Sequence, residues 1–409
     1  MRICILARSL PIHNKGGLED AVWSFSQGLG DQGQEITIIT ASHPQGLLDY
    51  EEKSGIKIHY LSGISGNPYS FDFKRAIVNK FLLLHQESPF NLVSLQSSGG
   101  YAFLEKDLGR KLNIPTVLSL YGTSFDELIT RFRLLKNIKQ WKDPLRQFCN
   151  LKEFLRFLFR FILVDRDFLN RADLILAPSP RQAKIVQNNY GITKEKVKVI
   201  FNGVDTALFR GGLSTQGLRQ NLGISTDSSI LLFAARLVEE KGAQVVIESL
   251  PDILNAFPQT VLVIVGDGEY LNTLKELADR LKLTKQVVFT GSADFNSLPL
   301  YFNLGDIFIN STLRENGYDL TLLEAMACSK AVIASNIGSN PTVINSGKDG
   351  ILIEVGNIKE LSAKILELLE NKEKRLQMGL NGRRKIEENF SQKAISVQLL
   401  EVFESLVKN

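Results

Sequence analysis

The stretch RENGYDLTLLEAMA at residues 314–327 decides how the rest of the chain is interpreted. A polar loop carrying Arg314, Glu315 and Asn316 leads into a helical pattern that presents Glu324 in its first turn, followed by small residues. One carboxylate can accept hydrogen bonds from two hydroxyl groups, such as the cis-diol of a ribose. The start of a helix also favours an anion such as a phosphate. The stretch therefore predicts a site for a sugar-like ligand that carries a phosphate.

Apolar runs of strand length flank this stretch, and the pattern repeats along the whole chain. DIFIN (306–310) precedes it and KAVIAS (330–335) follows it. Several runs are apolar on both faces, as buried parallel strands should be, and helical segments lie between most of them. The other runs are 2–7, 35–41, 56–61, 91–96, 116–120, 173–178, 197–201, 229–235, 260–266, 286–291 and 350–354. Repeated β-α units predict an α/β fold with two doubly wound sheets that bind ligands at the carboxyl ends of their strands.

Two cations lie where such a sheet would bind an anion. Arg236 follows the run SILLFAA (229–235) and should project at the carboxyl edge of the sheet, and Lys241 lies five residues further on, at the next helix start. Activated sugars carry a diphosphate leaving group. Fixed cations and helix dipoles can neutralise such a group as it departs, without a metal. Two solvated surface charges are the alternative. With 314–327, this pair defines a candidate donor-phosphate site.

A divalent metal held by an Asp-x-Asp motif is the other way to bind a diphosphate, and the chain contains Asp165-Arg166-Asp167. This tripeptide lies in a predicted helix and does not follow a strand, so we interpret it as a surface charge pair. We expect no metal and no other cofactor.

RLVEEKG (236–242) and ENGYDLTLLEAMA (315–327) resemble the two signatures of the family 4 retaining glycosyltransferases, which have the two-Rossmann-domain GT-B fold. Further similar segments occur in the family's order: GGLE at 16–19, YGTSFD at 121–126, NGVD at 202–205, GDGEYL at 266–271, VFTG at 288–291 and NGRRKIEENFS at 381–391. The resemblance implies a hexosyltransferase. It would move a hexose from a nucleotide-diphosphate sugar to a saccharide or lipid-linked acceptor. The anomeric configuration of the sugar would be retained, and no metal would be needed.

A chain of 409 residues exceeds what one core usually fills, so two or three domains are expected. The Gly-rich stretch 210–223 is the best boundary. We expect an acceptor domain over 1–207 and a donor domain over 208–390, both Rossmann-like and facing a central cleft. By the resemblance, 391–409 forms a last helix that crosses back onto the first domain. Ser391 suits its N-cap, and apolar residues follow at helical spacing.

The resemblance gives roles to further residues. Glu324 would bind the nucleotide ribose, unless it only complements the helix dipole. Gly16 and Gly17 follow the first strand, where backbone amides can approach a phosphate closely, although a plain turn there would look the same. The remaining predicted substrate-binding residues are Asn202, Gly203, Gly266, Gly268, Glu315, Gly317, Asp319, Leu320 and Thr321.

The chain departs from the family pattern at three positions. Asn316 stands where the spacing to Glu324 places the family's first glutamate, so either Asn316 substitutes for it or the loop shifts by one residue and the adjacent Glu315 takes its place. Asp319 stands where a glycine is common. Tyr121 replaces a histidine near the reaction centre, and a tyrosine with a pKa near 10 is a poor base at neutral pH. Retention does not need that base if the leaving phosphate takes the acceptor proton. We therefore expect catalysis from Arg236, Lys241, Glu324, Asn316 and Tyr121. His13 either supplies an imidazole or is a loop residue without a role.

A basic, aromatic helical insert is predicted over 125–171. Residues 131–171 hold 11 Lys/Arg and 4 Asp/Glu, a net charge of +7. Apolar side chains recur at helical spacing at 151, 154, 155, 158, 159, 162 and 163. Such a helix either packs into the first domain or lies on an anionic membrane surface, where it would meet a lipid-linked acceptor.

Composition excludes several other classes. The net charge of +4 is too small to imply nucleic acid, and three scattered cysteines fit neither a disulfide framework nor a zinc site. No signal peptide and no run of 18 apolar residues is apparent, so we expect a cytoplasmic protein, acting at the inner face of the membrane if the insert binds lipid. Two alternatives stay open: a catalytically impaired sugar-nucleotide-binding or scaffold subunit of a glycan assembly complex, and a sugar-nucleotide epimerase. A nicotinamide oxidoreductase is disfavoured because LARSLPIHNKGG (6–17) is not a compact Gly-x-Gly-x-x-Gly turn.

Overall fold

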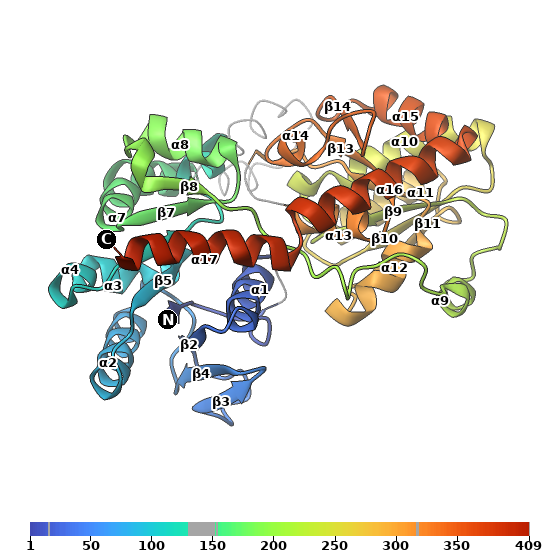
Figure 1. Ribbon diagram of the computed structural model, residues 1–409. Helices are drawn as coiled ribbons and strands as arrows, with labels where there is room; N and C mark the ends of the chain where they lie inside the picture. Colours follow the sequence, from blue (N-terminus) through green and yellow to red (C-terminus); the bar gives the residue numbers. More distant parts are fainter. Residues whose placement is uncertain (15–16, 130–151, 153, 316–318, 409) are drawn as a thin grey trace. The chain divides into compact units, whose positions relative to one another are not determined.

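The computed structural model describes residues 1–14, 17–129, 152, 154–315 and 319–408, which form two compact units (Figure 1). Unit 1 comprises Met1–Gly203 and Gln392–Asn409, and unit 2 comprises Val204–Ser391. The sequence placed these crossings at 207/208 and 390/391. The first crossing comes earlier because Val204 pairs with Ser391 in an isolated bridge and its N–H donates to Phe390 O at 2.9 Å. These bonds attach the chain to unit 2 before the Gly-rich stretch begins.

Unit 1 is built on an eight-stranded sheet with the order β3-β4-β2-β1-β5-β6-β7-β8. Neighbouring strands are parallel except β3 and β4, which are antiparallel. The strands are β1 (Arg2–Leu6), β2 (Glu35–Ala41), β3 (Tyr50–Lys53), β4 (Ile56–Leu61), β5 (Leu92–Gln96), β6 (Thr116–Ser119), β7 (Leu174–Ala177) and β8 (Val197–Val199). The edge strand β3 was not predicted, because its sequence YEEK is polar and carries no apolar run.

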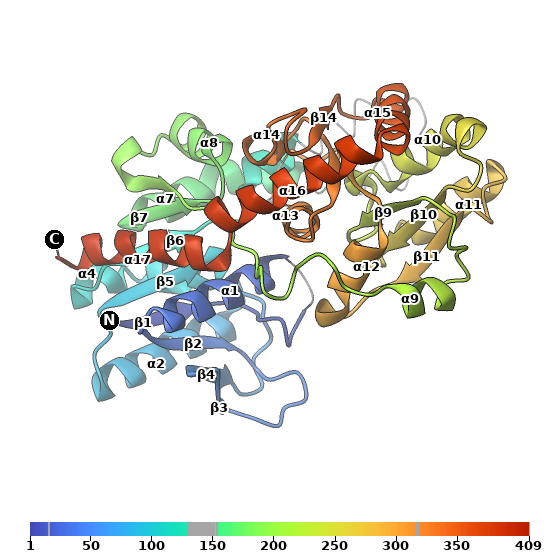
Figure 2. The same ribbon diagram turned by 45° about the vertical axis from the view of Figure 1, so that its right-hand side comes forward.

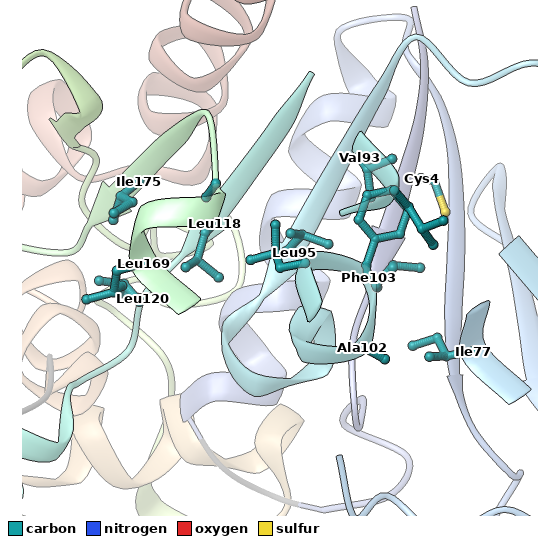
Figure 3. Close-up of a cluster of buried hydrophobic side chains, with 14 of the residues drawn as sticks. Cys4, Ile77, Val93, Leu95, Ala102, Phe103, Leu118, Leu120, Leu169 and Ile175 are labelled. Atoms are coloured by element: carbon teal, nitrogen blue, oxygen red, sulfur yellow. The ribbon is translucent and has the colours of Figure 1, made fainter. Parts of the chain in front are cut away.

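Alternation along these strands separates two cores, one on each face of the sheet. Cys4 and Leu6 face a cluster that includes Ile77 of α2 (Phe71–Glu87) and Phe103 of α3 (Tyr101–Glu105) (Figure 3). Ile3 and Ile5 face the other cluster. The remaining helices that enclose the first cluster are α4 (Leu108–Leu112), α7 (Arg166–Arg171) and α8 (Pro180–Tyr190).

The second face of the unit 1 sheet is covered by α1 (Gly17–Asp31) and α17 (Gln392–Lys408), which lie side by side (Figures 1 and 2). A Cβ on Gly28 of α1 would lie 2.6 Å from Ser396 Cβ of α17, so the glycine allows the two helices to approach closely. Ile395, Leu399 and Phe403 of α17 are buried in this cluster. The carboxyl-terminal helix therefore belongs to the amino-terminal unit.

Unit 2 is built on a six-stranded, fully parallel sheet with the order β11-β10-β9-β12-β13-β14. Its strands are β9 (Ile230–Ala234), β10 (Val261–Val265), β11 (Val287–Gly291), β12 (Ile307–Asn310), β13 (Ala331–Ser335) and β14 (Ile351–Ile353). Its helices are α9 (Gln216–Asn221), α10 (Ala243–Ala256), α11 (Leu271–Arg280), α12 (Leu298–Leu304), α13 (Leu320–Ala327), α14 (Asn340–Val343), α15 (Ile358–Glu370) and α16 (Lys372–Asn389).

Both sheets are doubly wound. The direction of winding reverses between β1 and β5 in unit 1 and between β9 and β12 in unit 2. In open α/β sheets, ligands bind at the carboxyl ends of the strands beside such a reversal. This confirms the predicted fold class, two Rossmann-like domains, and directs attention to the loops that follow these strands.

Candidate functional site

In unit 2 the loops that follow β9 and β12 are tied together. Leu313 N donates to Glu240 O at 2.8 Å, and the Ser311 hydroxyl donates to Gly242 O at 2.8 Å. Gly242 has a φ of 78°, and a Cβ there would lie 2.0 Å from Ser311 O. Only glycine fits this contact, which places Lys241 beside the loop that leads to α13.

The two predicted phosphate-binding cations differ in their surroundings. Arg236 is exposed and forms no ion pair with any residue that the structure describes. Lys241 ends the short 3-10 helix η5 (Glu239–Lys241) and forms an ion pair with Asp319, with side chains 18% and 14% exposed. The sequence predicted both cations as site residues. It did not predict that Lys241 is already paired with a carboxylate of the protein.

Asp319 is held from both sides. One carboxylate oxygen accepts from Lys241 Nζ, and the other accepts from Asn310 Nδ2 at 3.1 Å, at the end of β12. Asn340, almost fully buried, donates to Ser335 O at 3.0 Å and to Asn310 Oδ1 at 3.5 Å. Burial alone would raise the pKa of Asp319, but the Lys241 ammonium and the Asn310 amide outweigh it and lower that pKa. Asp319 is therefore an ionised member of a network that joins the ends of β9, β12 and β13.

Glu324 is buried, with 5% of its surface exposed. The sequence placed it in the first turn of a helix, but α13 begins at Leu320, so Glu324 lies in the second turn. The helix dipole acts mainly within the first turn. Complementing the dipole therefore explains this buried carboxylate poorly, and ribose binding by Glu324 stays a prediction.

Gly266 and Gly268 follow β10 and contact the backbone that carries Arg236. A Cβ on Gly266 would lie 1.9 Å from Ala235 O, and one on Gly268 would lie 2.3 Å from Leu237 O. Leu237 N donates to Asp267 O at 2.9 Å. Packing alone therefore explains why glycine is present at these two positions: the loop after β10 lies close against the loop after β9.

In unit 1 a second cluster of polar side chains lies at the carboxyl ends of β1, β5 and β6. The Ser9 hydroxyl donates to Glu19 Oε1 at 2.6 Å, and the Tyr121 hydroxyl donates to Gln96 Oε1 at 2.7 Å. Burial, together with the charge of Glu19, raises the pKa of Tyr121. Glu19 is in the first turn of α1, which begins at the predicted residue Gly17. Tyr121 therefore stays protonated and can orient a ligand oxygen without acting as a base.

Two carboxylates, those of Asp126 and Asp165, accept hydrogen bonds that hold the loop after Tyr121 in place. Asp126 is fully buried and accepts from Thr123 N at 3.0 Å and from Gln182 Nε2 at 2.8 Å. Asp165 accepts from Ser124 N at 3.2 Å and from the Tyr190 hydroxyl at 3.2 Å. The interpretation of Asp165-Arg166-Asp167 as a surface charge pair was thus wrong for Asp165.

His13 is a loop residue. Leu10 N donates to His13 Nδ1 at 3.0 Å, and Nε2 lies 3.1 Å from Ser42 O. Because Nδ1 accepts, Nε2 carries the proton and donates, so both ring nitrogens are used within unit 1. Asn202 is buried three residues after the end of β8, and Gly203 is the last residue of unit 1 before the crossing.

The other predicted site residues are near Asp319 in the sequence or fall outside the described part of the chain. Glu315, Leu320 and Thr321 are half-buried, and Leu320 and Thr321 open α13. Gly16, Asn316 and Gly317 fall outside the described residues. Sequence reasoning missed Ser9, Gln96, Asn310 and Asn340. Gln96 and Asn310 share a signal, a polar side chain that ends an apolar strand.

Two family models together match most of the chain. Residues 15–208 match "Glycosyltransferase Family 4", and residues 214–385 match "Glycosyl transferases group 1". The chain belongs to the family 4 glycosyltransferases. It covers 64%, 59% and 54% of the lengths of the first three curated relatives to which it is similar. One of these, at 29% identity over 49% of this chain and 54% of the relative, is the GDP-mannose-dependent alpha-(1-6)-phosphatidylinositol monomannoside mannosyltransferase of Mycolicibacterium smegmatis.

Solved structures support the fold of this family 4 glycosyltransferase. Sucrose-phosphate synthase from Thermosynechococcus elongatus is similar over 100% of this chain and 99% of its own, with a TM-score of 0.78 and 19% identity. Anabaena HepE in complex with UDP and glucose is similar over 99% of this chain and 100% of its own, with a TM-score of 0.74 and 22% identity. At these identities the likeness shows the fold alone.

No group of three or more His, Cys, Asp or Glu side chains that could hold a metal occurs among the described residues. Independence from metal stays a prediction. At the switch point of unit 2 the arrangement offers an exposed guanidinium, an ammonium bound to a carboxylate and a buried glutamate. These groups can bind a diphosphate and a neighbouring diol.

Proposed function

We propose that this glycosyltransferase moves a hexose from a nucleotide-diphosphate sugar to a saccharide or lipid-linked acceptor, with retention and without a metal. The observation that carries the proposal is the position of Arg236, Lys241 and buried Glu324 on the loops and helix that follow β9 and β12. Cations placed at the developing charge of the leaving diphosphate lower the barrier most. The relative that uses GDP-mannose and the structural neighbour with bound UDP agree with a sugar-nucleotide donor.

In the proposed reaction the acceptor oxygen bonds to the anomeric carbon on the face from which the diphosphate leaves. The bond from that carbon to the phosphate oxygen breaks, and the acceptor proton passes to that oxygen. Arg236 and Lys241 stabilise its negative charge, Glu324 holds the ribose hydroxyls, and Tyr121 orients a sugar or acceptor oxygen. No protein base is needed, which agrees with the raised pKa of Tyr121.

The test is a thermal-shift screen against nucleoside diphosphates followed by donor hydrolysis and transfer assays. A matched ligand raises Tm by mass action. Arg236→Met should weaken binding of that ligand by roughly tenfold, the effect of losing one charge-assisted contact of about 1.4 kcal/mol. Arg384→Met, an exposed arginine of α16, is the matched control and should leave binding unchanged. Equal effects of the two substitutions would contradict the proposal.

A catalytically impaired binding or scaffold subunit is the second candidate, because Tyr121 and Asn316 replace the residues common in the family. Such a protein would bind the nucleotide sugar but neither hydrolyse nor transfer it. The assays above separate the two functions.

We further propose a peripheral contact with an anionic membrane on the cytoplasmic side, through the insert. In the helical residues 154–160, Leu155 and Phe159 are 54% and 60% exposed, and Arg156 is exposed beside them. Further along the insert, Phe161 packs against Phe125 and Tyr190, with ring centroids 5.4 and 5.1 Å apart. Part of the insert is thus anchored while an apolar, basic face is left to solvent, as surface-binding helices require. No helix of the described residues has the length and apolarity needed to cross a bilayer.

Vesicles with and without phosphatidylserine test this contact. Binding to the anionic vesicles should weaken with salt, and serine at Leu155 and Phe159 should remove it. Leu376 and Leu380 of α16, also four residues apart and 55% and 57% exposed, are the control pair. Loss of binding in the control pair, or none at low salt in the wild type, would contradict a specific membrane face.

A further inference from the structure

The ion pair between Lys241 and Asp319 has a consequence for nucleotide binding that the family pattern does not supply. Asp319 stands where a glycine is common in the family, and its carboxylate occupies the anion-binding side of Lys241. The two side chains are mostly buried, so water weakens their attraction less than at an open surface. Any anionic ligand of Lys241 has to compete with this internal carboxylate.

We propose that Asp319 is a latch on the phosphate site. In the empty enzyme its carboxylate forms an ion pair with Lys241. This ion pair breaks when Lys241 binds the diphosphate of the donor, and it forms again when the nucleoside diphosphate leaves. The inference rests on the proposed function, because it needs a diphosphate at Lys241. Asp319 would thereby lower affinity for donor and product alike and speed product release.

The surroundings of Asp319 allow the lysine to leave. The Asn310 amide donates to Asp319 at 3.1 Å independently of Lys241. The charge of Arg314 also lowers the pKa of Asp319, so a cation other than Lys241 lies near the carboxylate. A buried charge stripped of every partner would be costly, but this one keeps a hydrogen bond and a neighbouring positive charge.

The size of the effect follows from population arithmetic. When only a fraction of the enzyme has Lys241 released, the apparent dissociation constant is the intrinsic one divided by that fraction. A latch worth about 1.4 kcal/mol leaves roughly a tenth of the molecules competent. Removing the carboxylate should therefore tighten nucleoside diphosphate binding by about tenfold.

Isothermal titration of the full chain with UDP, GDP and ADP in metal-free buffer tests the latch. Asp319→Asn keeps the side-chain shape and an oxygen for Asn310, and should lower the dissociation constant of whichever ligand the wild type binds. Asp319→Glu keeps the charge and should restore weaker binding. If Asp319 instead positioned Lys241 for the phosphate, Asp319→Asn would weaken binding, and that result, or no change, would overturn the latch.

Combining Asp319→Asn with Lys241→Met adds a second measurement, the cost in affinity of Lys241→Met in each background. A purely structural role of Asp319 would not change this cost. Lys241→Met should cost more affinity in the Asp319→Asn background than in the wild type, because the lysine is already free there. Equal costs would overturn the latch.

A matched control exists within unit 2. Lys385 pairs with Asp349 at 2.9 Å, with side chains 18% and 4% exposed. Asp349→Asn should lower stability without changing nucleotide affinity. A comparable gain in affinity would show a general effect of removing a buried carboxylate and would overturn the assignment to Asp319. A wild type that binds no nucleoside diphosphate, in this titration or in the thermal-shift screen, would refute the proposed function and the latch together, whereas wild-type binding with an unchanged Asp319→Asn variant refutes the latch alone.

Discussion

The Tyr121 hydroxyl donates a hydrogen bond of 2.7 Å to Gln96 Oε1 and so joins the ends of β6 and β5 in unit 1. Its proton is therefore committed to a protein acceptor, while the phenolic oxygen can still accept a hydrogen bond from a ligand. Tyr121 occupies the position of a family histidine without being able to take over the role of a base.

Tyr121→Phe should lower the free energy of unfolding by about 1 kcal/mol, since a single part-buried hydrogen bond is lost. The pH dependence of kcat between about pH 6 and 9 should match that of the wild type, because burial raises the pKa of Tyr121 above its usual value of 10. Urea denaturation and a pH-rate profile measure the two effects. An alkaline limb present in the wild type and missing from the variant would show that Tyr121 titrates during turnover.

Glu324→Ala should reduce kcat/KM for the donor by on the order of a hundredfold or more. Two charge-assisted hydrogen bonds to ribose hydroxyls, each about 1.5–3 kcal/mol, would be lost. Glu276→Ala on the exposed side of α11 serves as the control and should behave like the wild type. A loss below threefold for Glu324→Ala would argue against ribose binding.

Gly266→Ala should destabilise unit 2 by about 2 kcal/mol or more, because φ is 140° there and the new methyl group meets Ala235 O at 1.9 Å. Gly217→Ala in α9 meets no atom within 4 Å and should stabilise by up to about 1 kcal/mol, since alanine favours helices over glycine. Thermal unfolding of the two variants should therefore shift in opposite directions. Similar Tm values would refute the tight packing of this loop.

Asp20→Asn should stabilise the protein at pH 7.5 but not at pH 4. Burial, with the charge of Glu19, raises the pKa of Asp20 from 3.8 to about 6. A carboxyl with a raised folded-state pKa favours folding below its unfolded pKa and loses that contribution as pH rises through its folded pKa. Neutral asparagine avoids the loss, by on the order of 1 kcal/mol at pH 7.5. Urea melts at both pH values measure the difference, and a variant equally stabilised at both would contradict the shifted pKa.

The strands show how far local sequence goes. Each apolar run predicted as a strand contains one, because burial on both faces of a parallel strand leaves a continuous apolar signature. The edge strand β3 (Tyr50–Lys53) has no such signature, since it is stabilised by pairing with β4 and its side chains are largely exposed. VKVIF (197–201) pairs only to Val199, where the chain begins to turn toward the crossing.

The site shows a similar division. Arg236, Lys241 and Glu324 could be named because each follows a strand or lies near a helix start in a segment that resembles the family. That Glu324 is buried one turn inside α13, and that Asp165 supports the Tyr121 loop, follows from packing between distant segments. Periodicity and spacing carry no information about such partners.

The sequence by itself determined the two-sheet α/β architecture, the order of its strands along the chain and the residue types that gather after them, because periodicity and turn chemistry are local properties. Only the tertiary structure decided which strand ends are neighbours and which charges meet there. The pairing of Lys241 with Asp319, 78 residues apart, depends on β9 lying next to β12 and on a glycine at 242 that brings the two loops into contact. Such a contact between distant residues is fixed by the packing of the whole unit and cannot be read from either segment alone.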